Sequence, residues 1–512
     1  MPERMSRRTF LVAAGLAGAT ATDAAAFGGR RRLCPPQPCP LPPCPPRPWP
    51  PDNTLQVRQN VHALSPEQLE SLRRGVAAMK ALPDSDPRSW RFQANMHWTT
   101  GTPTNPLFNQ CQHGTQHFLS WHRAYLHFFE RILRQQSGDA ALCLPYWDWD
   151  TSRVLPDAYR VPDSASNPLW HPGRTLNDGS PLQPEDVSGL SGALAAGGYP
   201  GAGGFNSLLE DNPHGTVHGA VGGDMGSVPT AARDPIFWLH HANVDRLWDV
   251  WLAQGGGHTN PADAAWLDQS FPFVDESGNT VQARVGDYVS SARLGYRYDT
   301  TPPSVVVTAM VMAAGPPPVQ PRLVAASAPA DTPLNKVESK PLGFAIERVR
   351  VQAVSPATRT SMMAFPAPQS GSGGRVYIRV EGISAAGTPV GVRYGVYLNP
   401  PAAALTGDGR LQYHIGTINF FGKTLPELKM PGHGHAEHAG GPAGAFDQTF
   451  DATAVVARLR QTGQWNPDAL DVVIMPIANV PPGQSAEATQ VKAQASLKAA
   501  DVRYKRIAVL QD

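Results

Sequence analysis

Two stretches of the chain decide its fold: CQHGTQHFLSWHR at residues 111–123 and DPIFWLHHANVDR at residues 234–246. The first continues into a segment where apolar residues recur at three- and four-residue steps, namely Phe118, Trp121, Tyr125, Phe129 and Ile132. That spacing predicts one apolar face of a helix. The second predicts another helix through Phe237, His241, Val244 and Trp248. Histidines therefore lie in or just before two predicted helices.

Spacing sorts some of these histidines. His214 and His218, in PHGTVH at residues 213–218, are four apart, so on a helix they share a face and can chelate one ion. His241 and Asp245 are also four apart, so the carboxylate is expected to hold that imidazole. In contrast, the nine-residue spacing of residues 113 and 122 places them on opposite sides of a continuous helix. Both can face one metal only if His113 lies in the loop before the helix.

The number of histidines indicates a metal site but leaves the metal open. Eight of the 16 histidines lie in these clusters, including His97 in FQANMHW at residues 92–98. A zinc-protease motif needs a glutamate after its first histidine, and Gly114 and Gly215 stand there instead. Imidazole ligands suit copper as well as zinc, so ligand type does not identify the ion.

Length and composition indicate several domains and no charged partner. The 512 residues suggest about three domains. The balance of 43 Lys and Arg against 42 Asp and Glu gives no attraction to nucleic acid or membrane surfaces. Residues 375–381 alternate polar and apolar side chains, and residues 392–398 and 502–509 do so less strictly, which predicts strands. We therefore expect a mainly α domain with long loops at 53–300, a linker rich in Pro, Ala and Ser at 301–341, and a C-terminal β-rich domain at 342–512.

The N-terminus reads as an export signal. Residues 6–11, SRRTFL, form a twin-arginine motif, an apolar run follows to Ala19, and residues 24–26 offer a cleavage site. We expect a signal peptide at 1–26 and a periplasmic or secreted protein without a membrane anchor. A proline-rich leader at 27–52 holds Cys34, Cys39 and Cys44, an odd number that leaves a thiol unpaired or used otherwise. Their spacing does not fit a zinc knuckle.

Further motifs carry a resemblance to a known family. They are ALPDSDPRS at residues 81–89, LPYWDWD at 144–150, GDMG at 223–226, WLDQSF at 266–271 and LGYRY at 294–298. With the histidine clusters, they resemble the type 3 copper proteins, the tyrosinase and catechol oxidase family, and most of all the plant polyphenol oxidases. The resemblance covers nearly the whole chain after the leader, more weakly in the C-terminal part, which resembles the family's capping domain.

The resemblance implies a site and an activity. It implies a four-helix bundle around two copper ions per chain, with O2 as co-substrate and oxidation of o-diphenols to o-quinones. Weaker o-hydroxylation of monophenols is a further expectation, as is a C-terminal domain that covers the site and makes the chain partly latent. Carried over by position, the first copper takes His97, His113 and His122, and the second takes His214, His218 and His241. His117 and His240 remain neighbours, and we expect His240 to be a buried, hydrogen-bonded histidine.

Cys111 lies two residues before His113, as in the fungal members that link such a cysteine to the histidine by a thioether. The plant enzymes use a cysteine four residues after the first histidine, and Gly101 stands there in this chain. We expect the thioether between residues 111 and 113, with a free buried cysteine as the alternative.

Three positions bear on which phenols react. Glu210 matches a family glutamate that orients an active-site water. Gly215 stands where enzymes that hydroxylate monophenols often have asparagine, which favours diphenol oxidation in this chain. Val228 stands at a gate position that is a bulky phenylalanine in many plant enzymes, so we expect an open site.

Two other classes of protein remain open. One is an oxygen carrier of the same fold, which needs a site shielded from phenols. The other is a structural or copper-storage protein, in which His433, His435 and His438 would bind or deliver copper, although a solvated histidine-rich loop explains them equally well. We expect small phenols as partners, and the sequence leaves the oligomeric state open.

Overall fold

The computed structural model describes residues 55–201, 203–300, 322–329, 331–343, 345–363, 375–386, 391–423, 445–479, 498 and 500–511. The predicted export signal, the leader cysteines and the histidines at 433–438 lie outside these residues. Within them, no helix is both long enough and apolar enough to cross a membrane.

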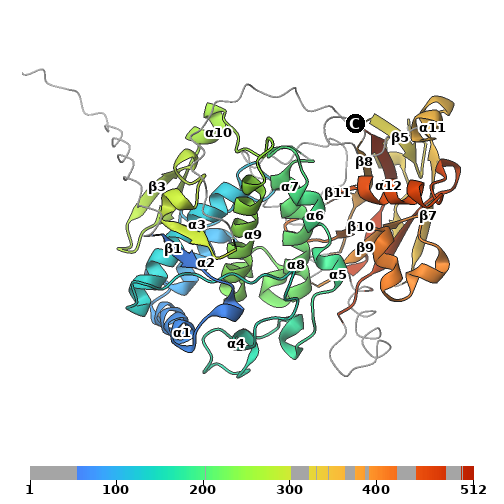
Figure 1. The fold of residues 1–512 in the computed structure, drawn as a ribbon. Coiled ribbons are helices and arrows are strands. Elements are labelled where there is room, and N and C mark those ends of the chain that lie inside the picture. Colours follow the sequence, from blue (N-terminus) through green and yellow to red (C-terminus); the bar gives the residue numbers. More distant parts are fainter. Residues whose placement is uncertain are drawn as a thin grey trace, which may run out of the picture. The chain divides into compact units, whose positions relative to one another are not determined.

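Helices dominate the first part of the described chain (Figure 1). Their bounds are α1 Pro66–Ala81, α2 Trp90–His97, α3 Phe118–Ser137, α4 Asp157–Arg160, α5 Pro184–Val187, α6 Leu190–Leu194, α7 Phe205–Leu209, α8 Gly215–Val221, α9 Ile236–Ala253 and α10 Ala264–Asp268. Ser65 and Gln68 form a capping box at the start of α1, with Pro66 in the first turn. The predicted helices are therefore present, while a regular four-helix bundle stays a prediction.

Helices α3 and α9 form the centre of this part. The five residues whose spacing predicted α3 are all buried, and the rings of Phe129 and Trp238 stack with centroids 3.3 Å apart between the two helices. Aromatic rings contribute large buried areas and fix the relative position of the helices they join. Because His122 and His241 lie on these helices, the same packing positions both histidines.

A buried ionic network ties α3 and α9 to two strands. Strands β1 (Gln56–Arg58) and β4 (Tyr296–Tyr298) pair in parallel. Asp245 accepts hydrogen bonds from Arg123 on α3, from Arg58 on β1 and from Tyr296 and Tyr298 on β4. The prediction that Asp245 holds His241 is therefore wrong, because four other donors occupy the carboxylate. A hairpin of β2 (Ser270–Val274) and β3 (Thr280–Arg284) packs beside α3.

The C-terminal part is an eight-stranded antiparallel sheet in the order β10-β9-β12-β7-β5-β14-β8-β11. The bounds are β5 Arg322–Ala326, β7 Glu347–Ala353, β8 Val376–Ile383, β9 Tyr394–Leu398, β10 His414–Ile418, β11 Phe446–Asp451, β12 Leu470–Pro476 and β14 Arg506–Gln511. Gln448 on β11 bonds the backbone of residues 417 and 419, so the two outer strands meet and the sheet closes toward a barrel. We call this sheet, with α11 (Pro356–Met363), α12 (Thr453–Gln461) and the short pair β6 (Lys340–Pro341) and β13 (Arg503–Tyr504), the C-terminal barrel.

The barrel corrects the predicted linker. Strand β5 pairs with β14 and β7, and Val324 and Ala325 are buried in the barrel core. From Arg322 onward, the segment predicted as a linker therefore contributes to the barrel. A small apolar run within a stretch rich in Pro, Ala and Ser gives little sequence signal, although its side chains are buried here.

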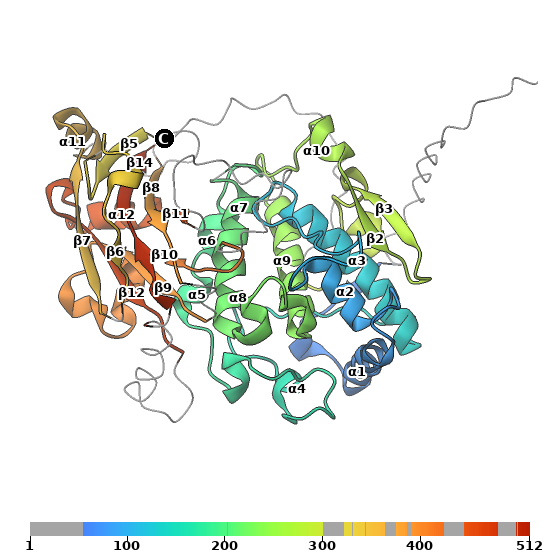
Figure 2. The same ribbon diagram turned by 180° about the vertical axis from the view of Figure 1, so that it is seen from behind.

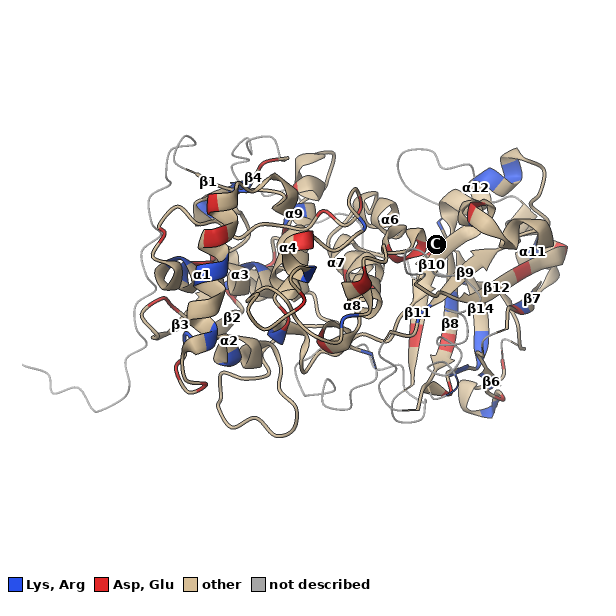
Figure 3. Cartoon of the chain, turned by 90° about the horizontal axis from the view of Figure 1, so that it is seen from below, with Lys and Arg blue, Asp and Glu red and all other residues tan. Residues whose placement is uncertain are grey.

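Strands β9 and β10 of the barrel lie beside α5 and α8 (Figure 2). Positions of acidic and of basic residues intermix along the ribbon of both parts (Figure 3). This distribution agrees with the nearly neutral composition.

Candidate metal centre

The helices bring the clustered histidines to one place. His97 is the last residue of α2, and His113 lies in the turn before α3 begins at Phe118, as the nine-residue spacing requires. His117 directly precedes α3, and His122 lies in its second turn. The other four lie just before or within α8 and α9. Of the eight clustered histidines, seven are at most 3% exposed: His97, His113, His122, His214, His218, His240 and His241.

Three histidines form a first triad. The ring centroid of His97 lies 5.1 Å from that of His113 and 5.7 Å from that of His122, and the centroids of His113 and His122 lie 5.4 Å apart. The Nδ1 atom of His97 lies 3.2 Å from the carbonyl of Val228, and that of His122 lies 2.8 Å from the carbonyl of Phe118. These carbonyls accept from an Nδ1–H, so each Nε2 keeps a lone pair for a metal.

Three more form a second triad. The ring centroid of His214 lies 4.7 Å from that of His218 and 5.0 Å from that of His241, and the centroids of His218 and His241 lie 5.4 Å apart. Backbone carbonyls of Glu210 and Met225 hold the Nδ1 atoms of His214 and His218 at 2.9 and 2.8 Å. The Nε2 atoms of His218 and His241 lie 3.2 Å apart, close enough to converge on one ion.

The two triads face each other. The rings of His122 and His241 stack with centroids 4.3 Å apart and an angle of 7°, and those of His113 and His214 lie 5.7 Å apart. A pair of ions held by the triads would therefore be close neighbours. Paired metals at short separation are the arrangement used for two-electron chemistry and for clamping one small molecule between two ions.

Burial prepares these imidazoles as ligands. It lowers the pKa of His122 to about 3 and those of the other five triad histidines well below their usual value, so all are neutral at ordinary pH. Neutral imidazole is the form that binds metal. The Nε2 atoms of four of them are buried without a hydrogen-bond partner: His97, His113, His122 and His214. Buried polar atoms are nearly always satisfied, so these orphaned nitrogens fit a metal site.

Two neighbours differ in their surroundings. His240 lies within 5.3 Å, ring to ring, of His214 and His218, and burial lowers its pKa to about 3. Both of its ring nitrogens are buried without a hydrogen-bond partner, so the prediction of a hydrogen-bonded His240 is wrong. Its distance from the second triad places it among the candidate ligands. His117 instead stacks on Trp266 at 5.7 Å and an angle of 12°, outside the cluster.

Cys111 is fully buried beside the first triad. Its Sγ lies 3.7 Å from Nδ1 of His113, and burial raises the pKa of the thiol well above its usual value. The sulfur is therefore a protonated thiol in contact with the imidazole edge. Cys143, the other cysteine among the described residues, is only partly buried and lies apart from the cluster.

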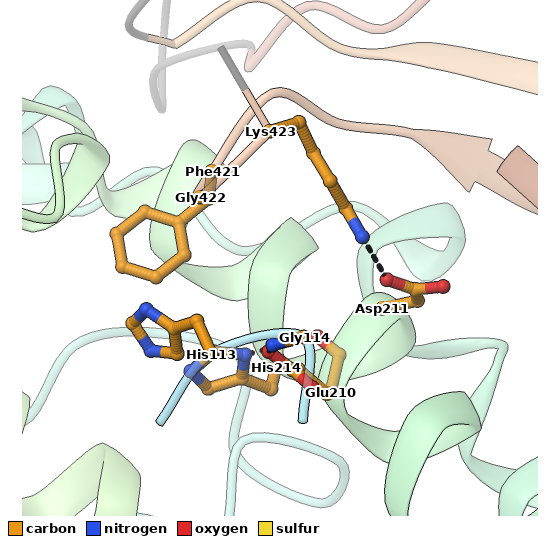
Figure 4. A pocket seen from close by; sticks show the side chains of 8 residues that line it. All are labelled: His113, Gly114, Glu210, Asp211, His214, Phe421, Gly422 and Lys423. Carbon is orange, nitrogen blue, oxygen red and sulfur yellow. Dashed lines mark hydrogen bonds and ion pairs between the residues drawn. The ribbon is translucent and has the colours of Figure 1, made fainter. Parts of the chain in front are cut away.

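A small cavity opens beside both triads (Figure 4). It has a volume of about 10 Å³ and is lined by His113, Gly114, Glu210, Asp211, His214, Phe421, Gly422 and Lys423. That volume is close to what one water molecule needs. Oε1 of Glu210 accepts the backbone N–H of Gly114 at 2.6 Å, and burial raises the pKa of this carboxyl to about 8.

Residues 419–423, which follow β10 and which we call the cover segment, lie over the cluster. The ring of Phe421 stacks on His218 with centroids 3.8 Å apart and an angle of 7°, and it meets His113 and His214 edge-on. Lys423 pairs with Asp211. The predicted open site at Val228 is therefore covered: Val228 is 1% exposed, and its Cγ2 lies under Gly422.

A second set of contacts holds the barrel to the helices. Arg393 forms a buried ion pair with Asp186 of α5 at 2.6 Å, and Arg410 pairs with Glu185 at the same distance. Tyr397 also donates to Glu185 at 2.9 Å. We call these three contacts the barrel clamp.

The family resemblance led us to expect that the C-terminal domain covers the site, but sequence reasoning missed the residues that form the cover segment and the clamp. No spacing rule links residues so distant along the chain. The only local signal is the apolar pair Phe420 and Phe421 directly after a strand, of which the first belongs to the barrel core and the second to the metal centre.

Comparison with known proteins assigns the family. Residues 87–196 and 191–254 match the common central domain of tyrosinase, and residues 260–306 match the polyphenol oxidase middle domain. Residues 336–494 match a domain of unknown function.

Individual relatives agree with these matches. A tyrosinase of Hahella sp. (strain CCB-MM4) is 35% identical over 314 residues, which cover 50% of this chain and 67% of the relative. A chloroplastic polyphenol oxidase of Vitis vinifera is 35% identical over 294 residues, 48% of each chain, so this chain matches about half the length of such plant relatives.

Solved structures show the same fold over most of the chain. A latent aurone synthase (polyphenol oxidase) gives a TM-score of 0.56 at 23% identity, covering 90% of this chain and 91% of that one. Latent apple tyrosinase gives 0.57 at 22% identity, covering 90% and 98%. The chain belongs to the tyrosinase and polyphenol oxidase family of type 3 copper oxidoreductases, whose cofactor is a pair of copper ions.

Proposed function

We propose that the protein oxidises o-diphenols to o-quinones with O2, with weaker o-hydroxylation of monophenols. The observation that carries this proposal is the pair of facing histidine triads in a chain of this family. When bound, the copper pair supplies two electrons to O2 and recovers them from the phenol.

We assign the first triad to one copper and the second to the other. The support is their geometry: each triad is compact, and backbone carbonyls hold the Nδ1 atoms of His97, His122, His214 and His218. Carbonyls that fix ring orientation before the metal arrives reduce the reorganisation needed on binding. His240 stays a neighbour in this assignment, because a three-ligand site leaves positions open for O2 and phenol.

Glu210 is proposed to hold a water beside the site. Its carboxyl lines the one-water cavity, and the nearby Lys423 opposes the rise of its pKa. A phenol has a pKa near 10, so deprotonation at neutral pH needs a base. In its ionised form, the Glu210 carboxylate can accept that proton through the water. With Gly215 beside it, no side-chain amide from that position polarises the water, and we therefore propose that diphenols are preferred over tyrosine.

We also propose that Cys111 forms a thioether to the ring of His113. A sulfur–carbon bond would replace one S–H and one ring C–H bond, and the two protons and two electrons released would pass to O2. The contact of sulfur and imidazole supports this step. The link would fix the orientation of an imidazole that no backbone carbonyl is seen to hold.

Partial latency is the regulatory part of the proposal. Phe421 covers the second triad in the position a substrate ring would need, and two solved structures of this fold are described as latent. Opening of the cover segment would admit phenols of both classes, since it removes the same ring from the path of each.

O2 uptake tests the proposal. We expect rapid uptake with 4-methylcatechol and L-dopa, slower uptake with tyrosine, and an increase for all three after mild detergent, with their ratio unchanged. Reversible O2 binding without turnover of 4-methylcatechol would instead indicate an oxygen carrier. Equal initial rates with tyrosine and L-dopa would contradict the argument from Gly215.

Export by the twin-arginine pathway is proposed from the motif at residues 6–11. Replacing Arg7 and Arg8 by lysine should stop export of a fused reporter; continued export would point to another route.

A further inference from the structure

Gly215 opens α8 directly after His214, and its backbone gives no reason for a glycine. Its φ and ψ are −64° and −32°, ordinary values for a right-handed helix. Any residue adopts such angles, and alanine favours a helix far more than glycine does. The reason for a glycine must therefore lie in what faces its missing side chain.

The side chain of Asn419, from the cover segment, faces it. A Cβ placed on Gly215 would lie 2.7 Å from Oδ1, 3.2 Å from Cγ and 3.2 Å from Nδ2 of Asn419, and these are its three nearest neighbours. The whole amide group therefore rests on the helix where a side chain would begin. A carbon atom cannot approach an oxygen to 2.7 Å without displacing it, because interiors are close-packed.

Asn419 has little freedom to move away. It is 1% exposed, its Nδ2 donates to the carbonyl of Asp211 at 2.9 Å, and its backbone N–H donates to Gln448. Turning the amide aside would leave a buried carbonyl and a buried amide unpaired, which is costly. The segment itself would have to shift, and with it Phe421 two residues later.

We propose that Gly215 is the docking seat of the cover segment, and that the contact of its bare Cα with the Asn419 amide keeps Phe421 over the metal centre. This inference rests on the proposed function only in naming phenol oxidation as the activity that docking restrains. It gives Gly215 a role in latency that is separate from substrate choice. It also means that asparagine at position 215 would loosen the cover as well as alter the chemistry.

The test compares two glycines of the same helix. Gly219 lies one turn further along α8 and also faces the barrel, but its added Cβ would lie 3.5 Å from the Arg393 side chain, an ordinary contact. In the full-length, copper-loaded protein, Gly215→Ala should make hydrogen exchange of the backbone amides in residues 415–423 at least about tenfold faster. Gly219→Ala should leave that exchange unchanged. Both substitutions replace glycine by alanine in the same helix, so a general effect on α8 would appear in both.

Removing the amide tests the pairing itself. Asn419→Ala alone should speed exchange, because the bond to Asp211 is lost. In the Gly215→Ala background the same change should slow exchange, because it removes the clash. This reversal of sign is the signature of a direct contact in a double-mutant cycle.

The inference would be overturned if hydrogen exchange in Gly215→Ala kept the wild-type rate, or if both glycine variants accelerated exchange equally. A separate readout tests the proposed function: the detergent activation of 4-methylcatechol oxidation should shrink in Gly215→Ala. If hydrogen exchange responds as expected and detergent activation does not, the result supports docking at Gly215 and contradicts the proposed restraint on phenol oxidation.

Discussion

Replacing Phe421 by alanine should release the site from its cover while leaving the barrel docked. The Phe421 ring is 6% exposed and lies flat on His218 with centroids 3.8 Å apart. A phenol that binds beside His218 must displace this ring. The substitution removes the obstacle without touching the barrel clamp.

The size of the effect follows from what the ring loses on leaving. Burying a phenylalanine side chain contributes about 1.5–3 kcal/mol, and a stacked pair adds about 0.5–1.5 kcal/mol. The covered state is therefore favoured by about 2–4.5 kcal/mol through this side chain, or about 30- to 2,000-fold. Apparent affinity falls by the fraction of molecules that are open, so Phe421→Ala should lower the KM for 4-methylcatechol by about 30-fold or more.

The assay is O2 uptake against 4-methylcatechol concentration, with and without mild detergent. We expect kcat to stay near its activated value and the effect of detergent on KM to disappear. Phe420→Ala is the matched control, because Phe420 is buried in the barrel core beside Phe446. It should lower the melting temperature of the barrel, since core phenylalanine truncations cost about 3–5 kcal/mol.

Two results would refute the reasoning. An unchanged KM in Phe421→Ala would mean that the ring does not compete with substrate. Equal activation by both variants would mean that loosening of the barrel, and not loss of this ring, opens the site.

Three further predictions follow from the metal centre and the clamp. His218→Ala should leave one copper per chain and almost no activity, whereas His117→Ala should keep both coppers; loss of copper from the latter would contradict the ligand assignment. The intact mass of the reduced, denatured protein should be two hydrogens short if the Cys111 thioether forms, and complete alkylation of that thiol would dismiss it. A chain cut at a protease site engineered between residues 301 and 321 should still elute as one species, while the same cut in Arg393→Ala should release the barrel. Release from the unsubstituted chain would show that the clamp is too weak to hold it.

The helices of the first part could be predicted from the sequence because their signals are local. The apolar spacing of α3 and the capping box of α1 each depend on residues within a few turns of one another. Once the resemblance had assigned His113 and His122 to one ion, geometry placed His113 before the helix, since one helix cannot present residues nine apart to one ion. Grouping of the histidines into two copper sites came from the family resemblance, and the facing triads support that assignment.

Two predictions failed where local spacing was ambiguous. A separation of four places His241 and Asp245 near each other on α9, but Asp245 turns toward Arg123 and the tyrosines of β4, which spacing cannot reveal. The linker was predicted too long because β5 contains few strongly β-forming residues. Its place between β14 and β7 is imposed by tertiary packing.

The resemblance predicted a covering C-terminal domain, but the residues that form the cover could not be predicted, because they meet the metal centre only through long-range contacts. Nothing near Asn419 or Phe421 in sequence indicates that they meet Gly215 and His218. A glycine next to a metal-site histidine suggested only a substrate effect. The contact with Asn419 supplies a second explanation, which requires the folded chain.

The two sets of contacts between barrel and helices make local opening easier than release of the barrel. Separation of the barrel would leave Asp186 without Arg393, and breaking a buried ion pair costs about 3–5 kcal/mol where the remaining charge stays buried. Glu185 would lose both Arg410 and Tyr397 in the same event. Withdrawal of residues 421–423 alone instead exposes the Phe421 ring and breaks the partly exposed pair of Lys423 with Asp211, and ion pairs at the surface contribute only about 0–1 kcal/mol. The lower-energy path to an open site therefore moves residues 421–423 and leaves the clamp and the buried Asn419 in place, so activators that act on these three residues need not detach the barrel.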